Sequence, residues 1–224
     1  MGIMYAIQPG EIRKAWHLRI LALSFSIPLF ISSDVLFGRS NLAHGEFRAS
    51  VLDIGQGTAV LIETANRRLL YDTGPIQGKK DDAGQRTILP YLRGRGIRQI
   101  DRMVISHSDS DHIGGAGSLL KHIQFDLMMG SLPSSNELIQ NLHTRKIPAM
   151  PCRFRQNWIW DGVEFFIWHP HEEALFEYEY SVRPNEMSCV LEIRNAQASF
   201  WLTGDVERQG EAEITERLDA EMLR

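Results

Sequence analysis

The chain has 224 residues, of which 43% are hydrophobic and 23% are charged. These proportions are typical of one compact folded domain with a short extension, and they exclude a mostly disordered chain. The formal net charge of −4 excludes a general electrostatic attraction to nucleic acid. Any contact with phosphate groups must therefore come from a local basic patch or from bound metal.

The first 44 residues differ in composition from the rest of the chain. Residues 20–33 form an uncharged run of 14 residues, shorter than the roughly 20 that cross a bilayer. Extending the run to residues 16–37 gives sufficient length. Arg13, Lys14 and Arg19 precede the centre of the run and predict a cytoplasmic N-terminus with the following domain across the membrane. We therefore expect an N-terminal extension over residues 1–44 with a transmembrane helix at about 16–37. A signal-peptide core and a buried helix of the globular domain are the alternatives.

The next segment is rich in β-forming residues. Residues 47–53, 58–64 and 67–72 are short apolar runs separated by turn residues, which predicts an antiparallel meander. Residues 85–95 carry apolar side chains at helical spacing and predict a helix that ends at Gly94 or Gly96. A strand over 103–106, a polar loop and a helix over 114–122 follow.

The second half repeats this arrangement. Residues 158–160 and 163–168 flank Asp161-Gly162, a strong signal for a β-hairpin. Residues 188–194 and 198–203 predict a second pair of strands, and residues 207–223 predict a helix. Two β-rich halves that each carry helices indicate an α+β fold, an αββα sandwich over residues 45–224.

The polar loop after residue 106 contains four side chains that can bind metal. They lie within six residues, with no Lys or Arg between them: His107, Asp109, Asp111 and His112. The alternate spacing of the first three lets them converge, and imidazole with carboxylate suits Zn²⁺ or Mn²⁺. Without a cation, the two carboxylates would repel each other. The alternative is a solvated loop in which Asp111 caps the next helix, but a cap explains neither histidine.

Two further carboxylates end predicted strands. Asp72 closes the run Leu70-Tyr71-Asp72, and Asp205 follows Thr203-Gly204. Aspartate is also common in turns, so neither is decisive alone.

The two cysteines, Cys152 and Cys189, have two possible states. They form one disulfide in an oxidising compartment, or they are two buried thiols. We favour the buried thiols.

Several motifs in order resemble one family. The loop is similar to the His-x-His-x-Asp-His motif of the metallo-β-lactamase superfamily, with Asp109 in place of the second histidine. Together with other motifs, this departure resembles the C-terminal domain of the ComEC family, the inner-membrane channel for DNA uptake in competent bacteria. The other motifs are Leu52-Asp53-Ile54-Gly55-Gln56-Gly57, Leu70-Tyr71-Asp72-Thr73-Gly74, Trp160-Asp161-Gly162-Val163, His169-Pro170, Asn185-x-x-Ser188-x-Val190-Leu191 and Leu202-Thr203-Gly204-Asp205.

The resemblance also implies roles for individual residues. His107 and Asp109 would hold one divalent ion, Asp111 and His112 a second, and Asp205 would bridge the two. The ions, one or two in number, would be Zn or Mn. Asp111 would also orient the attacking water as the catalytic residue. The residues that would support these ligands from behind are Asp53, Asp72, Asn185 and Ser188. The residues that could contact the DNA backbone, or simply form a solvated helix face, are Lys79, Lys80, Arg86, Arg93, Arg95, Arg98 and Arg102.

The chain departs from the family pattern at four points. One is that family members carry many membrane helices upstream, whereas here Met1 comes just before a single predicted one. The chain also has no His-His-Gly-Ser motif after residue 205, Thr58 stands where an acidic residue is common, and Met187 stands where Asn is common. We therefore expect a truncated piece of a ComEC-like protein, with a metallo-β-lactamase fold that is incomplete at the C-terminus. Its expected place is the bacterial inner membrane, with the domain on the extracytoplasmic side.

The function implied is metal-dependent hydrolysis of the DNA strand that is not transported. Its partners would be single-stranded DNA, the inner membrane and the rest of a DNA-uptake channel. The alternatives are a catalytically impaired scaffold of the channel and another hydrolase of the superfamily.

Overall fold

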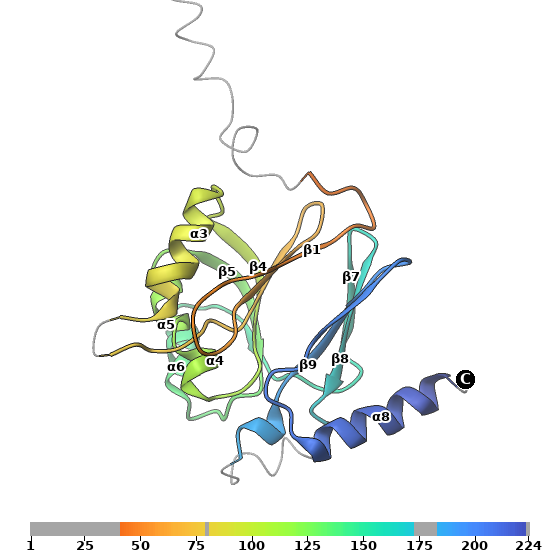
Figure 1. Ribbon diagram of the computed structural model, residues 1–224. Helices are drawn as coiled ribbons and strands as arrows, with labels where there is room; N and C mark the ends of the chain where they lie inside the picture. The colour runs from red at the N-terminus through yellow and green to blue at the C-terminus, as the bar shows by residue number, and fades with distance from the viewer. Residues whose placement is uncertain (1–40, 79–80, 173–182, 223–224) are drawn as a thin grey trace, which may run out of the picture. The chain divides into compact units, whose positions relative to one another are not determined.

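The computed structural model describes residues 41–78, 81–172 and 183–222 (Figure 1). These residues belong to one compact unit, Ser40–Arg224. The transmembrane segment predicted at about 16–37 lies outside the described residues. Within the described residues, no helix has both the length and the apolar character needed to cross a membrane.

The larger sheet has six strands in the order β1-β2-β3-β4-β5-β6. The first three are antiparallel neighbours, which confirms the predicted meander, and β3 to β6 are parallel. The strands are β1 (Arg48–Val51), β2 (Val60–Glu63), β3 (Arg68–Tyr71), β4 (Gln99–Ile105), β5 (Gln124–Gly130) and β6 (Ala149–Met150).

The smaller sheet has four antiparallel strands in the order β10-β9-β8-β7. Asp161 and Gly162 join β7 to β8 with φ angles of 50° and 81°. Two consecutive positive φ angles are those of a tight hairpin turn, as the sequence predicted. The strands are β7 (Asn157–Trp160), β8 (Val163–His169), β9 (Val190–Arg194) and β10 (Ser199–Leu202).

Helices cover the outer faces of both sheets, which confirms the αββα arrangement (Figure 1). The predicted helix over 85–95 is one π-helical turn followed by an α-helix. The helices beside the larger sheet are η1 (Gly84–Ile88), α3 (Leu89–Gly94), α4 (Ser110–Ile113), α5 (Ala116–Leu119) and α6 (Glu137–Thr144). Beside the smaller sheet lies α8 (Arg208–Met222), and η2 (Asn185–Met187) is a short 3-10 turn before β9.

The core forms on both faces of the larger sheet because side chains alternate along each strand. In β3, Leu70 packs against the helices, whereas Leu69 and Tyr71 pack against the smaller sheet. All three side chains are fully buried. The strand is therefore apolar on both faces and forms a rigid support for the residue that follows it, Asp72.

The two cysteines correct one of our expectations. Cys152 and Cys189 are joined by a disulfide, with their Cα atoms 5.8 Å apart, and are not two thiols. Cys152 lies in the segment after β6 and Cys189 directly precedes β9, and Cys152 N–H donates to the carbonyl of Gly130 at the end of β5. The bond therefore ties the larger sheet to the smaller one. Sequence spacing does not reveal this, because the contact depends on how the sheets stack.

Candidate metal centre

The predicted site residues come from the ends of three strands. Asp72 follows β3, and Ser106 and His107 follow β4; because these strands are parallel, their carboxyl ends meet at one edge of the sheet. Asp205 arrives from β10 of the other sheet after Gly204, which has a φ of 54°. A Cβ at Gly204 would lie 2.8 Å from the Cβ of Ser106, so only glycine lets this segment pass so close.

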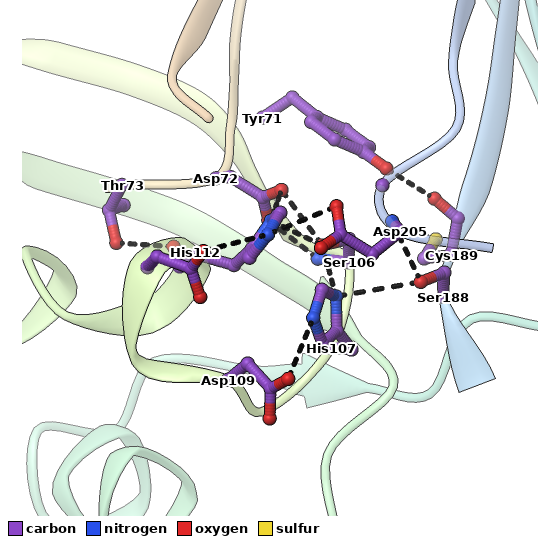
Figure 2. Close-up of polar contacts among 12 residues, drawn as sticks. Tyr71, Asp72, Thr73, Ser106, His107, Asp109, His112, Ser188, Cys189 and Asp205 are labelled. Carbon is purple, nitrogen blue, oxygen red and sulfur yellow. Dashed lines mark hydrogen bonds and ion pairs between the residues drawn. The ribbon is translucent and has the colours of Figure 1, made fainter. Parts of the chain in front are cut away.

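A buried carboxylate lies at the base of the site. The side chain of Asp72 has no exposed surface. Its Oδ1 accepts a hydrogen bond from the backbone N–H of Ser106 at 2.7 Å, and its Oδ2 accepts from the Ser106 hydroxyl at 2.8 Å. The same Oδ2 lies 2.8 Å from Nδ1 of His112 (Figure 2). Asp72 is thus hydrogen-bonded on every side, as a buried carboxylate must be.

This network sets the proton positions on both histidines. Nδ1 of His112 donates to Asp72, so its Nε2 carries the lone pair. Nδ1 of His107 lies 2.9 Å from the Ser106 hydroxyl oxygen, whose own proton goes to Asp72. Nδ1 of His107 is therefore the donor in that pair, and its Nε2 also carries a lone pair. One carboxylate orients both rings, directly for His112 and through Ser106 for His107.

The Nε2 atoms of His107 and His112 each lie near a carboxylate at the opening of the site. His107, His112 and Asp205 offer ligand atoms that all lie within 4.8 Å of one another. Nε2 of His112 lies 3.3 Å from Oδ1 of Asp205, and Nε2 of His107 lies 3.6 Å from Oδ2 of Asp109. Nε2 of His107 is buried and has no hydrogen-bond partner among the described residues. An orphaned, buried imidazole nitrogen beside carboxylates fits a divalent cation of the zinc or manganese type.

The pKa values of these groups follow from burial and from their neighbours. Burial lowers the pKa of His107, and the nearby His112 lowers it further. Burial also acts to lower the pKa of His112, but the hydrogen bond and charge of Asp72 and the charge of Asp205 outweigh it and raise the pKa. Burial raises the pKa of Asp72 against the hydrogen bond from His112. His107 is therefore neutral and suited to donate its lone pair.

The loop that carries the ligands is held by backbone contacts. Gly57, with a φ of 100°, lies so close to this loop that a Cβ there would be 2.1 Å from the carbonyl oxygen of Asp111. Thr58 N–H donates to the same carbonyl, and the N–H and hydroxyl of Thr73 both donate to the carbonyl of His112. The Gly55-Gln56-Gly57 motif therefore acts on the site through its backbone.

The two remaining loop carboxylates lie at the rim of the site. The side chain of Asp109 is 45% exposed, and that of Asp111 is 32% exposed with its Oδ2 3.9 Å from Nε2 of His112. The structure thus brings all five predicted metal ligands to one place, with His107 and His112 buried and the three aspartates facing solvent. The short helix α4 begins at Ser110, inside the segment predicted to be a loop.

The four residues predicted to support the ligands lie in different places. Asp72 contacts His112 directly, and the Ser188 hydroxyl lies 3.5 Å from Nδ1 of His107 while accepting from Asp205 N–H at 3.2 Å. Asp53 is exposed, and its carboxylate accepts from Gly55 N–H. Asn185 donates to Glu207, and its Oδ1 is buried with no hydrogen-bond partner among the described residues.

Those of the predicted basic residues that the structure describes do not form a single patch beside the metal centre. Arg95 pairs with the buried Glu63 at 2.5 Å, at the end of β2. Glu63 pairs in the sheet with Arg68, the first residue of β3, so this ion pair lies at the other end of β3 from Asp72. Arg102 lies 3.8 Å above the ring of Trp158, and burial lowers its pKa to about 10.

The other predicted basic residues are exposed, partly buried or outside the described residues. Arg86 donates to the carbonyl of Ile54, whereas Arg93 and Arg98 are exposed. Lys79 and Lys80 lie outside the described residues.

Ser106 is the one member of the network whose role the sequence did not reveal. Its position between a strand and His107 was visible, but serine is common where strands end. Its hydroxyl contacts Asp72 and the Nδ1 atoms of both histidines, at 2.9 Å for His107 and 3.2 Å for His112. Only the fold, which places β3 beside β4, brings these groups together.

Known proteins resemble this chain in sequence and fold. Residues 52–134 match the family model of the metallo-beta-lactamase superfamily. Competence protein ComA of Neisseria gonorrhoeae is 33% identical, over 83% of this chain and 24% of its own length. Recombination protein 2 of Haemophilus influenzae is 32% identical, over 88% of this chain and 23% of its own length. The metallo-beta-lactamase fold protein YhfI of Bacillus subtilis is 14% identical with a TM-score of 0.43, over 74% of this chain and 61% of that chain.

The chain spans about a quarter of the length of the two curated relatives. Residues 52–134, which match the family model, include Asp72 and the loop from His107 to His112. The chain is therefore a homologue of the ComEC-family competence proteins and carries a domain of the metallo-β-lactamase superfamily.

Proposed function

We propose that this chain is a metal-dependent phosphodiesterase that cleaves single-stranded DNA, the strand that is not transported during competence. The observation that supports this most directly is the buried Nε2 of His107, which has no hydrogen-bond partner among the described residues. His107 also belongs, with His112 and Asp205, to a group whose ligand atoms lie within 4.8 Å of one another. Superfamily membership supports metal-dependent hydrolysis, and the relatives are named as competence and recombination proteins. We infer DNA as the substrate because it connects hydrolysis with competence and recombination.

The residues that would hold the metal are His107, Asp109, Asp111, His112 and Asp205. One or two Zn or Mn ions, when bound, supply Lewis acidity toward a phosphoryl oxygen and lower the pKa of a water molecule. Asp72 holds the His112 ring so that Nε2 faces the site. Ser106 does the same for His107.

We propose that Asp111 orients the attacking water and accepts its proton. Its side chain is 32% exposed at the rim, so both solvent and substrate can reach it. The backbone N–H of Thr58 fixes its carbonyl. A carboxylate held beside the attacking water orients that water and accepts its proton. The buried Tyr71 cannot serve in this way, because its hydroxyl donates to the carbonyl of Cys189 and burial raises its pKa well above the usual value.

We further propose that the domain lies on the extracytoplasmic side of the inner membrane, as part of a DNA-uptake channel. The Cys152–Cys189 disulfide supports this side, because disulfides persist in oxidising compartments and are rare in the cytoplasm. The names of the relatives support the link to competence.

The test combines metal content with DNA cleavage. The full chain is loaded with Mn²⁺ or Zn²⁺, its metal content is measured by mass spectrometry, and cleavage of a labelled single-stranded oligonucleotide is followed. We expect one or two ions per chain, and loss of both metal and cleavage in the double variant His107→Ala, Asp111→Ala. The matched control is His122→Ala, Asp219→Ala, which removes the same residue types at exposed positions.

The outcomes separate the proposal from its main alternative. A chain that holds metal and cleaves DNA, with activity lost only in the first double variant, supports the phosphodiesterase. A chain that holds metal or binds DNA without cleaving it under saturating Mn²⁺ and Zn²⁺ is a scaffold of the channel. Cleavage that survives the loss of both His107 and Asp111 would show that this loop is not the active site.

A further inference from the structure

A cavity lies beside the metal centre and has no part in the network described above. It has a volume of about 320 Å³ and is open on one side. Ligand pockets in proteins begin at about 300 Å³, so this one has room for a small ring system. Its lining comes from the segment after β3, from α4 and α5, and from the start of α6.

The cavity and the metal centre share their supporting segments. Three parallel strands, β3, β4 and β5, end at one edge of the larger sheet. The segment after β3 provides Asp72 to the metal centre and Ile76 to the cavity, and the segment after β4 provides His112 and Ile113 in the same way. The segment after β5 provides Asn136 to the cavity. In sheets of this kind, ligands bind outside the carboxyl ends of the strands. His112 faces the metal centre and the next residue, Ile113, lines the cavity, so the two sites are neighbours.

The cavity wall combines apolar surface with two asparagines and one acidic residue, Glu137. Ile76, Ile113 and Leu138 provide aliphatic surface, and the side chain of Ile76 stays 58% exposed. Large apolar side chains left exposed beside a cavity often contact a ligand. Among the described residues that line the cavity, none is Lys or Arg.

The polar groups of the cavity offer both donors and an acceptor. The side-chain oxygen of Asn136 accepts from Leu138 N–H, and that of Asn141 accepts from Arg145. Each asparagine therefore has its amide N–H groups to offer, while the carboxylate of Glu137 is an acceptor. A phosphate would be repelled by Glu137. A neutral, planar ring with both donor and acceptor atoms on its edge would be bound.

We propose that this cavity binds an unpaired nucleobase of the substrate strand, next to the metal centre, and favours bases with an exocyclic amino group. The carboxylate of Glu137 accepts from the amino group of cytosine or adenine, which thymine lacks. Aliphatic side chains pack against the faces of the ring, as in other proteins that bind single-stranded bases. This inference rests on the proposed function, because it takes DNA as the substrate.

The test fills the cavity without disturbing the fold. Gly117 lines the cavity within α5, and a Cβ there would meet no atom within 4 Å. Gly94 at the end of α3 has equally open surroundings but does not line the cavity. Gly117→Leu is thus the test variant and Gly94→Leu its matched control. Glu137→Gln removes the acceptor charge alone.

Binding is measured on the full chain by fluorescence anisotropy with labelled oligodeoxycytidylate and oligodeoxythymidylate of equal length. EDTA is present, so that metal-dependent cleavage cannot occur. We expect the parent and Gly94→Leu to bind the cytosine oligomer at least about tenfold more tightly, the selectivity of one good base contact. This preference should disappear in Gly117→Leu and weaken in Glu137→Gln, whose neutral amide oxygen is a weaker acceptor.

Unchanged preference in Gly117→Leu, or no preference in the parent, would overturn the inference. Cleavage of both oligomers is measured separately with Mn²⁺. Cleavage that proceeds equally in the parent and in Gly117→Leu, on either oligomer, leaves the proposed function standing and removes the nucleobase site. Base preference without any cleavage supports the nucleobase site and contradicts the proposed function.

Discussion

The carboxylate of Asp72 lies 2.8 Å from Nδ1 of His112 and reaches His107 through the hydroxyl of Ser106. One buried side chain thus fixes the orientation of both imidazoles. Their Nε2 atoms face Asp205 and Asp109 as a result. We therefore expect the affinity of the site for metal to depend on Asp72, although Asp72 is not among the residues proposed to bind the metal.

Replacing Asp72 with Asn should weaken metal binding by about 10- to 100-fold, the usual effect of losing a group that orients a ligand. The amide offers His112 a weaker acceptor than the carboxylate, so the ring loses its fixed tautomer. Affinity is measured by competition with a chelator. Asp53→Asn is the control, because Asp53 is exposed and bonds only its near neighbour Gly55 in the hydrogen bond described. Equal losses in the two variants would contradict the assignment of Asp72.

Gly57→Ala should destabilise the protein more than Gly55→Ala. Both glycines have positive φ angles, 100° and 84°, and a side chain there costs about 1–2 kcal/mol. At Gly57 the added Cβ would also lie 2.1 Å from the carbonyl oxygen of Asp111, whereas at Gly55 the nearest atom is 3.8 Å away. Urea unfolding gives the free-energy difference. Gly57→Ala should also reduce metal content, because the ligand loop must move.

Equal stability and equal metal content in the two glycine variants would contradict this view of Gly57. The comparison is informative because the backbone strain is similar in both and only the contact differs.

Much of the site was predictable because its ligands are close in sequence. His107, Asp109, Asp111 and His112 lie within one loop, and a loop that leaves a strand keeps such residues together. The strand pattern also placed Asp72 at a strand end. The strand before it was predictable from its run of apolar residues. The run is apolar because alternate residues, such as Leu69 and Leu70, pack into the cores on opposite faces of the sheet.

The features that escaped prediction depend on tertiary contacts. No pattern in residues 124–150 led us to β5, α6 and β6, although Asn136 caps α6 by accepting from Leu138 N–H. The disulfide depends on how the two sheets stack, which brings Cys152 to Cys189. The cavity depends on packing between segments that are distant in sequence.

Loss of the Cys152–Cys189 disulfide should lower the free energy of unfolding by about 2–4 kcal/mol, the usual range for a disulfide. The bond closes a loop between residues 37 apart and ties the two sheets together. The double variant Cys152→Ala, Cys189→Ala is compared with the parent in urea unfolding, each with and without dithiothreitol. The reductant should destabilise the parent and leave the variant unchanged. A parent that is insensitive after full reduction would contradict the prediction.

Acid should destabilise the protein through His169. Its side chain is buried, and burial is the main cause that lowers its pKa below the ordinary 6.5. Arg217 and His171 lower the pKa further, while the hydrogen bond to the carbonyl of Ser188 and the charge of Glu213 act to raise it. In the unfolded chain the imidazole regains its ordinary pKa. Between the two values the unfolded chain therefore binds a proton that the folded chain does not.

The sign of the effect follows from this difference in bound protons. The contribution of His169 is complete above pH 6.5 and is lost as the pH falls below 6.5 toward the lower pKa of the folded state. Urea unfolding at pH 7.5 and 5.5 should show a larger loss for the parent than for His169→Gln, whose amide N–H can still donate to Ser188. His122→Gln, at an exposed histidine, should lose as much stability between pH 7.5 and 5.5 as the parent does. If His169→Gln also lost as much stability as the parent, the prediction would be wrong, because the fold would then tolerate a charged His169.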